Sequence, residues 1–136
     1  MPRNRPDGKL EALRGVPLFA ALNKRELASI GQIADEIDIP AGKELIREDE
    51  PGRQFFVVLE GEAVVRRKGR KINAVGAGDF LGEIALLSNR PTTATVTTTT
   101  PIRLAVITRT NFSKLLRENP GIQLSLLKTL AERLPN

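Results

Sequence analysis

The sequence predicts an α+β protein, in which short antiparallel strands form the centre and helices lie at both ends. Short apolar stretches, some alternating with polar residues, fill the middle of the chain and are separated by glycine-containing turns. Sustained helical periodicity occurs only before Glu36 and after Thr108. Many short strands at close spacing favour a sandwich or a roll over a parallel sheet.

Length and composition indicate one folded domain. The 136 residues are too few for two ordinary domains, and contents of 40% hydrophobic and 27% charged residues are near globular averages. Residues 1–9 are polar and basic. We therefore expect a flexible basic tail over residues 1–9 and a single domain over residues 10–136.

The residue types that are absent exclude several functions. Without cysteine or histidine, the chain has no disulfides, no thiolate or imidazole metal ligands, and no Ser-His or Cys-His catalytic pair. We expect no enzymatic activity, no metal and no resident cofactor. No apolar run approaches the roughly 20 residues that span a bilayer, and the N-terminus lacks a secretory apolar segment, so we expect a cytoplasmic protein.

One helix and then a series of strands are expected before Thr108. Asn23 is suited to cap a helix over Lys24–Ile33, and Glu26 occupies the position that completes a capping box. The expected strands lie around Ile37–Ile39, Leu45–Ile46, Phe55–Leu59, Ala63–Val65, Ile72–Val75, Thr93–Thr98 and Ile102–Ile107.

Two helices are expected after Thr108. Thr110 or Asn111 is predicted to cap the first, and Pro120 is suited to open the second. The second helix carries an apolar stripe that consists of Ile122, Leu126, Leu127, Leu130 and Leu134. Such a stripe packs against its own domain or pairs with a partner, and both alternatives remain open.

The stretch Gly78–Val96 is predicted to form a turn, a very short helix, a loop and a strand. Glycines precede the apolar run Ile84–Leu87. A glycine-rich turn that leads into a helix leaves backbone N–H groups unpaired, and these donors favour an anion. Glu83 lies among them and can accept hydrogen bonds from a ligand hydroxyl. The pattern thus predicts a small anion pocket, unless the stretch is only a turn and helix that close the roll.

This stretch resembles the phosphate-binding cassette of the cyclic nucleotide-binding domain family. That family has a Gly-Glu-apolar-Ala run at the start of a short helix, followed by a Pro-Arg-small-Ala-Thr/Ser-Val run. The corresponding runs here are Gly82–Leu87 and Pro91–Val96. The resemblance extends from about Leu18 to Leu134. It implies an eight-stranded, antiparallel jelly-roll-like β-roll that acts as a regulatory sensor of cAMP or cGMP.

The resemblance also implies the ligand-binding residues. Gly82 opens the short helix, Glu83 would accept the ribose 2′-hydroxyl, and backbone N–H groups near Ile84 and Ala85 would meet the phosphate. Thr92 stands where the family has the arginine that pairs with the cyclic phosphate. Since a threonine supplies no charge, we expect binding to be weakened by about 10- to 100-fold, or lost.

Two compensations for the missing arginine are conceivable. Thr92 and Thr93 together offer two hydroxyl donors, and Arg90 is a candidate to turn its guanidinium inward. The alternative for Arg90 is a solvated loop residue. If neither compensates, the chain is a ligand-independent interaction or dimerisation module with a degenerate pocket.

Two other segments suggest partners. An unidentified effector protein, or a second copy of the chain, is expected at the C-terminal helix. No helix-turn-helix follows in the sequence, so no DNA-binding domain is expected. Five basic residues around Gly69, within Arg66–Lys71, predict a hairpin tip that contacts nucleic acid or an anionic membrane, or is simply solvated.

Overall fold

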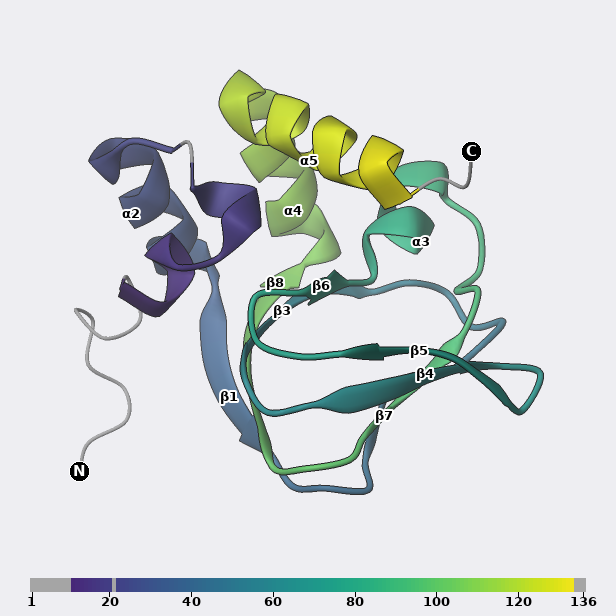
Figure 1. The fold of residues 1–136 in the computed structure, drawn as a ribbon. Coiled ribbons are helices and arrows are strands. Elements are labelled where there is room, and N and C mark those ends of the chain that lie inside the picture. The colour runs from purple at the N-terminus through teal and green to yellow at the C-terminus, as the bar shows by residue number, and fades with distance from the viewer. Residues whose placement is uncertain (1–10, 21, 134–136) are drawn as a thin grey trace.

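Two four-stranded antiparallel sheets with helices from both ends of the chain make up the computed structural model (Figure 1). It describes residues 11–20 and 22–133. The predicted tail over residues 1–9 and Leu134 of the predicted stripe lie outside the described residues. No helix of the described part of the chain is both long and apolar enough to cross a membrane.

The strand order confirms the predicted α+β fold and its jelly-roll-like β-roll. The first sheet has the order β1-β8-β3-β6 and the second has the order β2-β7-β4-β5, and neighbouring strands pair antiparallel. The strands are β1 Asp35–Ile39, β2 Glu44–Ile46, β3 Gln54–Glu60, β4 Ala63–Arg67, β5 Arg70–Val75, β6 Phe80–Leu81, β7 Thr95–Thr98 and β8 Ile102–Thr108. The helical segments are η1 Pro17–Phe19, α2 Lys24–Ile33, α3 Glu83–Ser88, α4 Arg109–Glu118 and α5 Pro120–Arg133.

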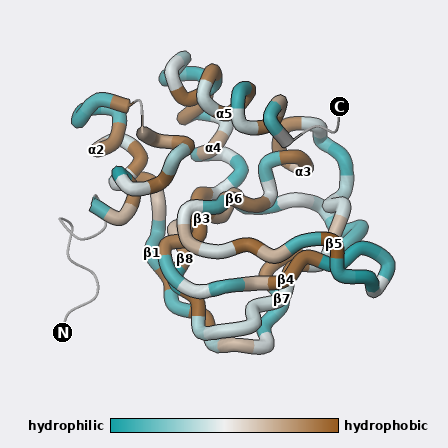
Figure 2. Tube along the Cα trace, viewed as in Figure 1, coloured by the Kyte–Doolittle hydropathy of each residue, from teal (hydrophilic) through white to brown (hydrophobic). Residues whose placement is uncertain are grey.

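Strands β3 and β8 of the first sheet are apolar on both faces. On β3, Phe55 and Val57 belong to a core cluster that includes residues of the helices, whereas Phe56 and Val58 belong to a second cluster that includes residues of the second sheet. Both faces are therefore removed from water, which explains why β3 is a continuous apolar run in the sequence. Figure 2 shows these hydrophobic strands in brown, with a hydrophilic hairpin extending from β4 and β5.

The N-terminal helix forms as the sequence predicts. The Asn23 side chain accepts a hydrogen bond from the Glu26 N–H at 2.8 Å, and the Glu26 carboxylate accepts one from the Asn23 N–H at 3.0 Å. These two bonds satisfy backbone donors that the first turn would otherwise leave unpaired. Leu27 and Ile30 are buried in the helix-side core. The predicted capping box is confirmed.

The start of α4 corrects one prediction. The N-cap is Thr108, whose hydroxyl accepts from the Asn111 N–H at 3.2 Å, so the prediction of Thr110 or Asn111 was wrong. Strand β8 continues to Thr108 and turns directly into the helix, which leaves no linker for a later cap. The prediction that Pro120 opens the last helix is confirmed.

The last helix buries only part of its predicted stripe. Ile122 and Leu126 are buried in the helix-side core, and Leu130 packs against it. Leu127 is 64% exposed and Leu124 is 55% exposed. Helix α5 is thus fixed to the domain by one face and presents two leucines to solvent on another.

The basic run forms the tip of the β4–β5 hairpin, as predicted. Lys68 and Gly69 make the turn with positive φ values of 52° and 78°. The Lys68 N–H donates to the Glu48 carboxylate at 2.9 Å, which ties the tip to the segment after β2.

Candidate functional site

A cavity of about 510 Å³ lies between the second sheet and the segment that leads into α3. The predicted residues Gly82, Glu83, Ile84 and Ala85 line it from one side. Thr92 and Thr93 line it from the segment before β7, and residues of β2, β4, β5, β6 and β7 form the rest of the wall. The structure therefore brings together six of the seven residues that the sequence singled out, and their role in binding remains a prediction.

Gly82 determines the position at which α3 begins beside the cavity. It is the N-cap residue, and its φ of 92° lies in the left-handed region. A Cβ atom at Gly82 would come within 2.5 Å of the Gln54 carbonyl oxygen on β3. Only glycine satisfies both requirements. No side chain caps the helix at this residue, so the first-turn N–H groups of α3 have no side-chain acceptor at the N-cap.

Glu83 and Ala85 are the buried members of the α3 wall. Glu83 is only 6% exposed, so its carboxylate is a mostly desolvated acceptor beside the cavity. Ala85 is also buried, and it faces Gly52 at the approach to β3. Ile84 is half exposed and adds an apolar surface to the cavity. A buried acceptor beside apolar surface suits a ligand with hydroxyl groups and a planar apolar part.

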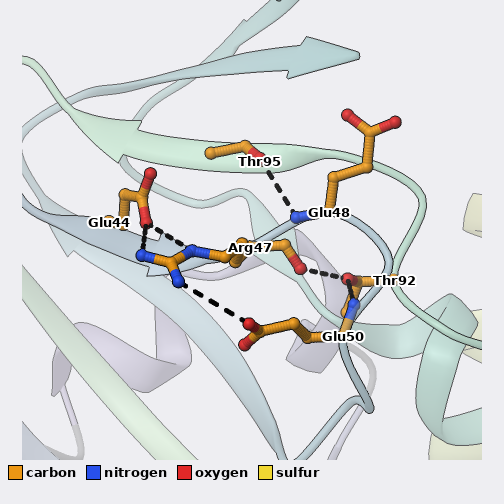
Figure 3. A network of polar contacts seen from close by, with 6 residues as sticks. All are labelled: Glu44, Arg47, Glu48, Glu50, Thr92 and Thr95. Atoms are coloured by element: carbon orange, nitrogen blue, oxygen red, sulfur yellow. Dashed lines mark hydrogen bonds and ion pairs between the residues drawn. The ribbon is translucent and has the colours of Figure 1, made fainter. Parts of the chain in front are cut away.

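The Thr92 hydroxyl is already used within the protein. It donates a hydrogen bond to the Arg47 carbonyl and accepts one from the Glu50 N–H at 3.2 Å (Figure 3). Two backbone hydrogen bonds of 2.9 Å, one each with Asp49 and Glu50, hold the same pair of segments together. In this arrangement Thr92 gives a ligand neither a charge nor its hydroxyl proton.

Thr92 belongs to a series of threonines that satisfy backbone donors near β2. Three hydroxyl groups, spaced three residues apart, accept from three backbone N–H groups: Thr92 from Glu50, Thr95 from Glu48 at 3.0 Å and Thr98 from Lys43 at 2.9 Å. The sequence predicted a strand here from the high β-propensity of threonine. It gave no sign that the hydroxyl groups attach β7 and the segment before it to β2 and the loop after it.

The structure places Arg90 away from the cavity. Arg90 is exposed, does not line the cavity, and lies beside a separate hollow with Asn89, Pro91 and Arg109. A role for Arg90 in binding requires that its loop rearrange, and it stays a prediction. Thr93 is exposed at the cavity, and its carbonyl accepts a hydrogen bond from Nε of Arg67 at 3.0 Å.

Sequence reasoning missed two arginines, one at the cavity and one at the separate hollow beside Arg90. The sequence predicts Arg67 as part of the basic hairpin tip, but Arg67 lines the cavity. The detectable signal was the period of two along β4, because Val65 and Arg67 share a face of the strand. Arg109 donates to the Gly52 carbonyl from Nε at 3.1 Å and Nη2 at 2.7 Å, and to the Asn89 side chain from Nη1 at 2.9 Å. No pattern in the neighbouring sequence predicts these contacts of Arg109.

The eight strands form a β-roll domain, and a cavity lies between the second sheet and the short helix that begins at Gly82. Residues 36–119, more than half of the chain, match the family model described as the cyclic nucleotide-binding domain. The chain belongs to the cyclic nucleotide-binding domain family.

A curated relative extends this comparison. The cAMP-dependent protein kinase regulatory subunit of Emericella nidulans is 36% identical to this chain over 106 residues, which cover 76% of this chain and 26% of the relative. The chain therefore spans about a quarter of the length of that protein.

Two solved structures share the fold along nearly the whole chain. The regulatory domain of Toxoplasma gondii PKA in complex with cAMP has a TM-score of 0.83 at 25% identity, covering 94% of this chain and 50% of that one. The regulatory subunit of a cAMP-independent protein kinase A from Trypanosoma brucei has a TM-score of 0.81 at 25% identity, covering 96% and 48%. That structure is a variant bound to cAMP, with three replacements: glutamate by alanine, threonine by arginine and valine by alanine.

Proposed function

We propose that this chain is a regulatory module that binds cAMP or cGMP weakly and transmits the bound state to a partner. One observation carries the proposal. The cavity retains the buried acceptor Glu83 and the α3 start at Gly82, while the residue in the place of the family's arginine, Thr92, is neutral and already hydrogen-bonded.

The expected weakness follows from charge. A cyclic phosphodiester carries one negative charge, which is costly to remove from water without a counter-charge. A hydrogen bond to a charged group contributes about 1.5–3 kcal/mol and a neutral one about 0.5–1.5 kcal/mol. Since Thr92 already donates its proton to Arg47, even the neutral bond requires that the loop rearrange. An affinity about 10- to 100-fold below that of a cassette with its arginine is the expected result.

The similar proteins support a regulatory role and cAMP as a ligand class. The fungal relative is a kinase regulatory subunit, and the Toxoplasma domain was solved with cAMP. The Trypanosoma subunit belongs to a cAMP-independent kinase, and its cAMP-bound form carries a threonine-to-arginine replacement among its three changes. Replacement of Thr92 by arginine is therefore the most informative substitution in this chain.

Contacts between α3 and α4 offer a route by which ligand binding at α3 would be transmitted to the C-terminal helices. Leu86 of α3 belongs to the same buried cluster as Phe112 and Leu115 of α4. Arg109 joins the start of α4 to Asn89, the C-cap of α3, and to Gly52. A ligand that shifts α3 would therefore shift α4, provided that it binds one arrangement more tightly than the other.

Calorimetric titration of the wild-type chain and Thr92→Arg with cAMP and cGMP tests the proposal. We expect weak binding by the wild type and an affinity at least about tenfold higher in Thr92→Arg, because the guanidinium restores the counter-charge. Thr99→Arg adds the same charge at an exposed position outside the cavity and is expected to change little. A sub-micromolar dissociation constant for the wild type, or equal affinities of wild type and Thr92→Arg, contradicts the proposal.

A ligand-independent interaction module is the second candidate. It is favoured by the commitment of the Thr92 hydroxyl and by the exposed Leu124 and Leu127, which are three residues apart on α5. Thermal melting with millimolar cAMP or cGMP separates the candidates, because a ligand that binds only the folded state raises the melting temperature. No shift with either nucleotide, together with a dimer that Leu127→Glu disrupts, supports the second candidate.

A further inference from the structure

The cavity has an unbalanced set of charged groups. Among the described residues that line it, Arg67 is the one cation, and Asp79 and Glu83 are the two acids. Asp79 accepts a hydrogen bond from the Gly76 N–H at 2.9 Å, which holds the turn before β6. Any counter-charge that a bound anion finds on the cavity wall in this conformation comes from Arg67.

Strand geometry directs Arg67 toward the cavity and Arg66 away from it. Val65 and Arg67 both line the cavity from β4, while Arg66 lies between them in sequence and does not. Successive side chains of a strand point to opposite faces, so the two neighbouring arginines differ in orientation although both are exposed. This provides a matched pair that differs in access to the cavity but not in charge.

One hydrogen bond holds the Arg67 guanidinium beside the cassette. Its Nε–H donates to the carbonyl of Thr93 at 3.0 Å, across 26 residues of sequence. The Nε–H is one of five donors, so four N–H donors on the two terminal nitrogens remain in a planar fork. That fork matches two oxygens of a phosphate group. Thr93 directly follows Thr92, so the charge lies next to the position from which the family's arginine is missing.

We propose that Arg67 is the phosphate-binding residue of this pocket, supplying from β4 the charge that the cassette loop lacks. The proposal rests on the proposed function, because it requires that a cyclic nucleotide enter the cavity. Since Arg67 is exposed at the cavity, its attraction for the phosphate is screened by water and salt more than that of a buried arginine. Weak, salt-sensitive binding is the consequence.

Titrations of wild type, Arg67→Gln, Arg67→Lys and Arg66→Gln with cAMP test the assignment. We expect Arg67→Gln to weaken binding by about tenfold or more, and Arg67→Lys to lose less because it keeps the charge but not the fork. Arg66→Gln removes an equal charge from the opposite face and is expected to change affinity by less than about twofold. Raising the salt concentration from about 50 to about 300 mM should weaken wild-type binding more than that of Arg67→Gln.

The outcomes separate this inference from the function on which it rests. Equal losses of affinity in Arg66→Gln and Arg67→Gln mean that the hairpin attracts the anion only through its overall charge. This result overturns the assignment of Arg67 but leaves the proposed binding by the wild type intact. Unchanged affinity in Arg67→Gln overturns it in the same way. If the wild type binds neither nucleotide at millimolar concentration, the proposed function fails and Arg67 is insufficient as a counter-charge. Thermal melting of each variant confirms that the fold is retained.

Discussion

Gly52 lies directly against Ala85, so that a Cβ atom on Gly52 would come within 2.5 Å of the Cβ of Ala85. The segment before β3 therefore packs against α3 so closely that no space for a methyl group remains between them. We expect Gly52→Ala to destabilise the fold by about 1–3 kcal/mol because it overpacks this contact. Chemical denaturation measures the loss.

A double-mutant cycle assigns this cost to the contact. Ala85→Gly in the Gly52→Ala background should recover about 1 kcal/mol or more relative to the sum of the single changes. Gly76→Ala is the control, because its added Cβ would meet no heavy atom closer than the Gly61 carbonyl oxygen at 3.8 Å. Additive effects of the two changes would show that Gly52 acts through the backbone and not through Ala85.

Substitution of Thr92 should affect stability separately from binding. Thr92→Val keeps the shape but removes the hydroxyl that joins the Arg47 carbonyl and the Glu50 N–H. Because these two groups also share a long backbone hydrogen bond of 3.4 Å, we expect a loss of about 0.5–1.5 kcal/mol. Thr92→Ser retains the hydroxyl and should lose much less. Thermal or urea denaturation of the two variants measures how much the hydroxyl contributes to stability. Equal stability of Thr92→Val and Thr92→Ser would show that its hydrogen bonds contribute little.

Arg103 is expected to stabilise the first sheet through three carboxylates. Its guanidinium lies 3.2 Å from Asp38, 3.4 Å from Glu36 and 3.3 Å from Glu60, and its side chain is 17% exposed. Arg103→Met leaves these carboxylates close together without a cation. Asp38 and Glu60 are largely solvated, but the Glu36 side chain is only 9% exposed, so we expect a loss of about 2–3 kcal/mol that added salt reduces in part. Arg47→Met, at an exposed cluster with Glu44 and Glu50, is the control with a smaller expected effect.

The contribution of Arg103 should not depend on pH near neutrality. The hydrogen bond to Asp38 raises the pKa of the Arg103 guanidinium above its ordinary value. A raised pKa means that the stabilisation is fully present below the pKa of the unfolded chain and is lost only as the pH rises through the higher folded value. The stability difference between wild type and Arg103→Met should therefore be constant between about pH 6 and 9, where arginine stays protonated. A steep change within that range would implicate another group.

Arg109→Gln should weaken the connection between α3 and α4. It removes the paired hydrogen bonds to the Gly52 carbonyl and the contact with Asn89. We expect faster amide exchange over residues 83–88 and 109–112, and a smaller effect of cAMP on exchange in α4 than in the wild type. Arg117→Gln, on the same helix and exposed, is the control. An undiminished ligand effect in Arg109→Gln would exclude this route of transmission.

Local signals in the sequence predicted much of the architecture. The capping box of Asn23 and Glu26 involves residues three apart, so it is visible in the sequence and forms as expected. Apolar runs, period-two patterns and glycine turns predicted seven of the eight strands but not the two-residue β6, Phe80–Leu81, and the two linked runs of the cassette predicted the segment that lines the cavity. These features depend on neighbours in sequence or on a recognisable spacing.

The remaining site features depend on contacts between distant segments. The bond of Arg67 to Thr93 spans 26 residues, and that of Arg109 to Gly52 spans 57. The hydroxyl of Thr92 meets Arg47 across 45 residues. A basic run or a threonine run has no local pattern that says which of its members turns inward, so these roles emerge only when the two sheets are placed together.

Strands β3 and β8 are apolar on both faces, which weakens the usual constraint on their alignment. A slip of one residue normally exposes an apolar face to water, but here it would exchange Phe55 and Phe56 between two dry compartments. Arg103 supplies the missing constraint, since its Cα partners are Asp38 on one side and Glu60 on the other. A shifted pairing would set its guanidinium beside an aliphatic neighbour. Arg103 thus favours the observed alignment of β8 with both of its neighbouring strands.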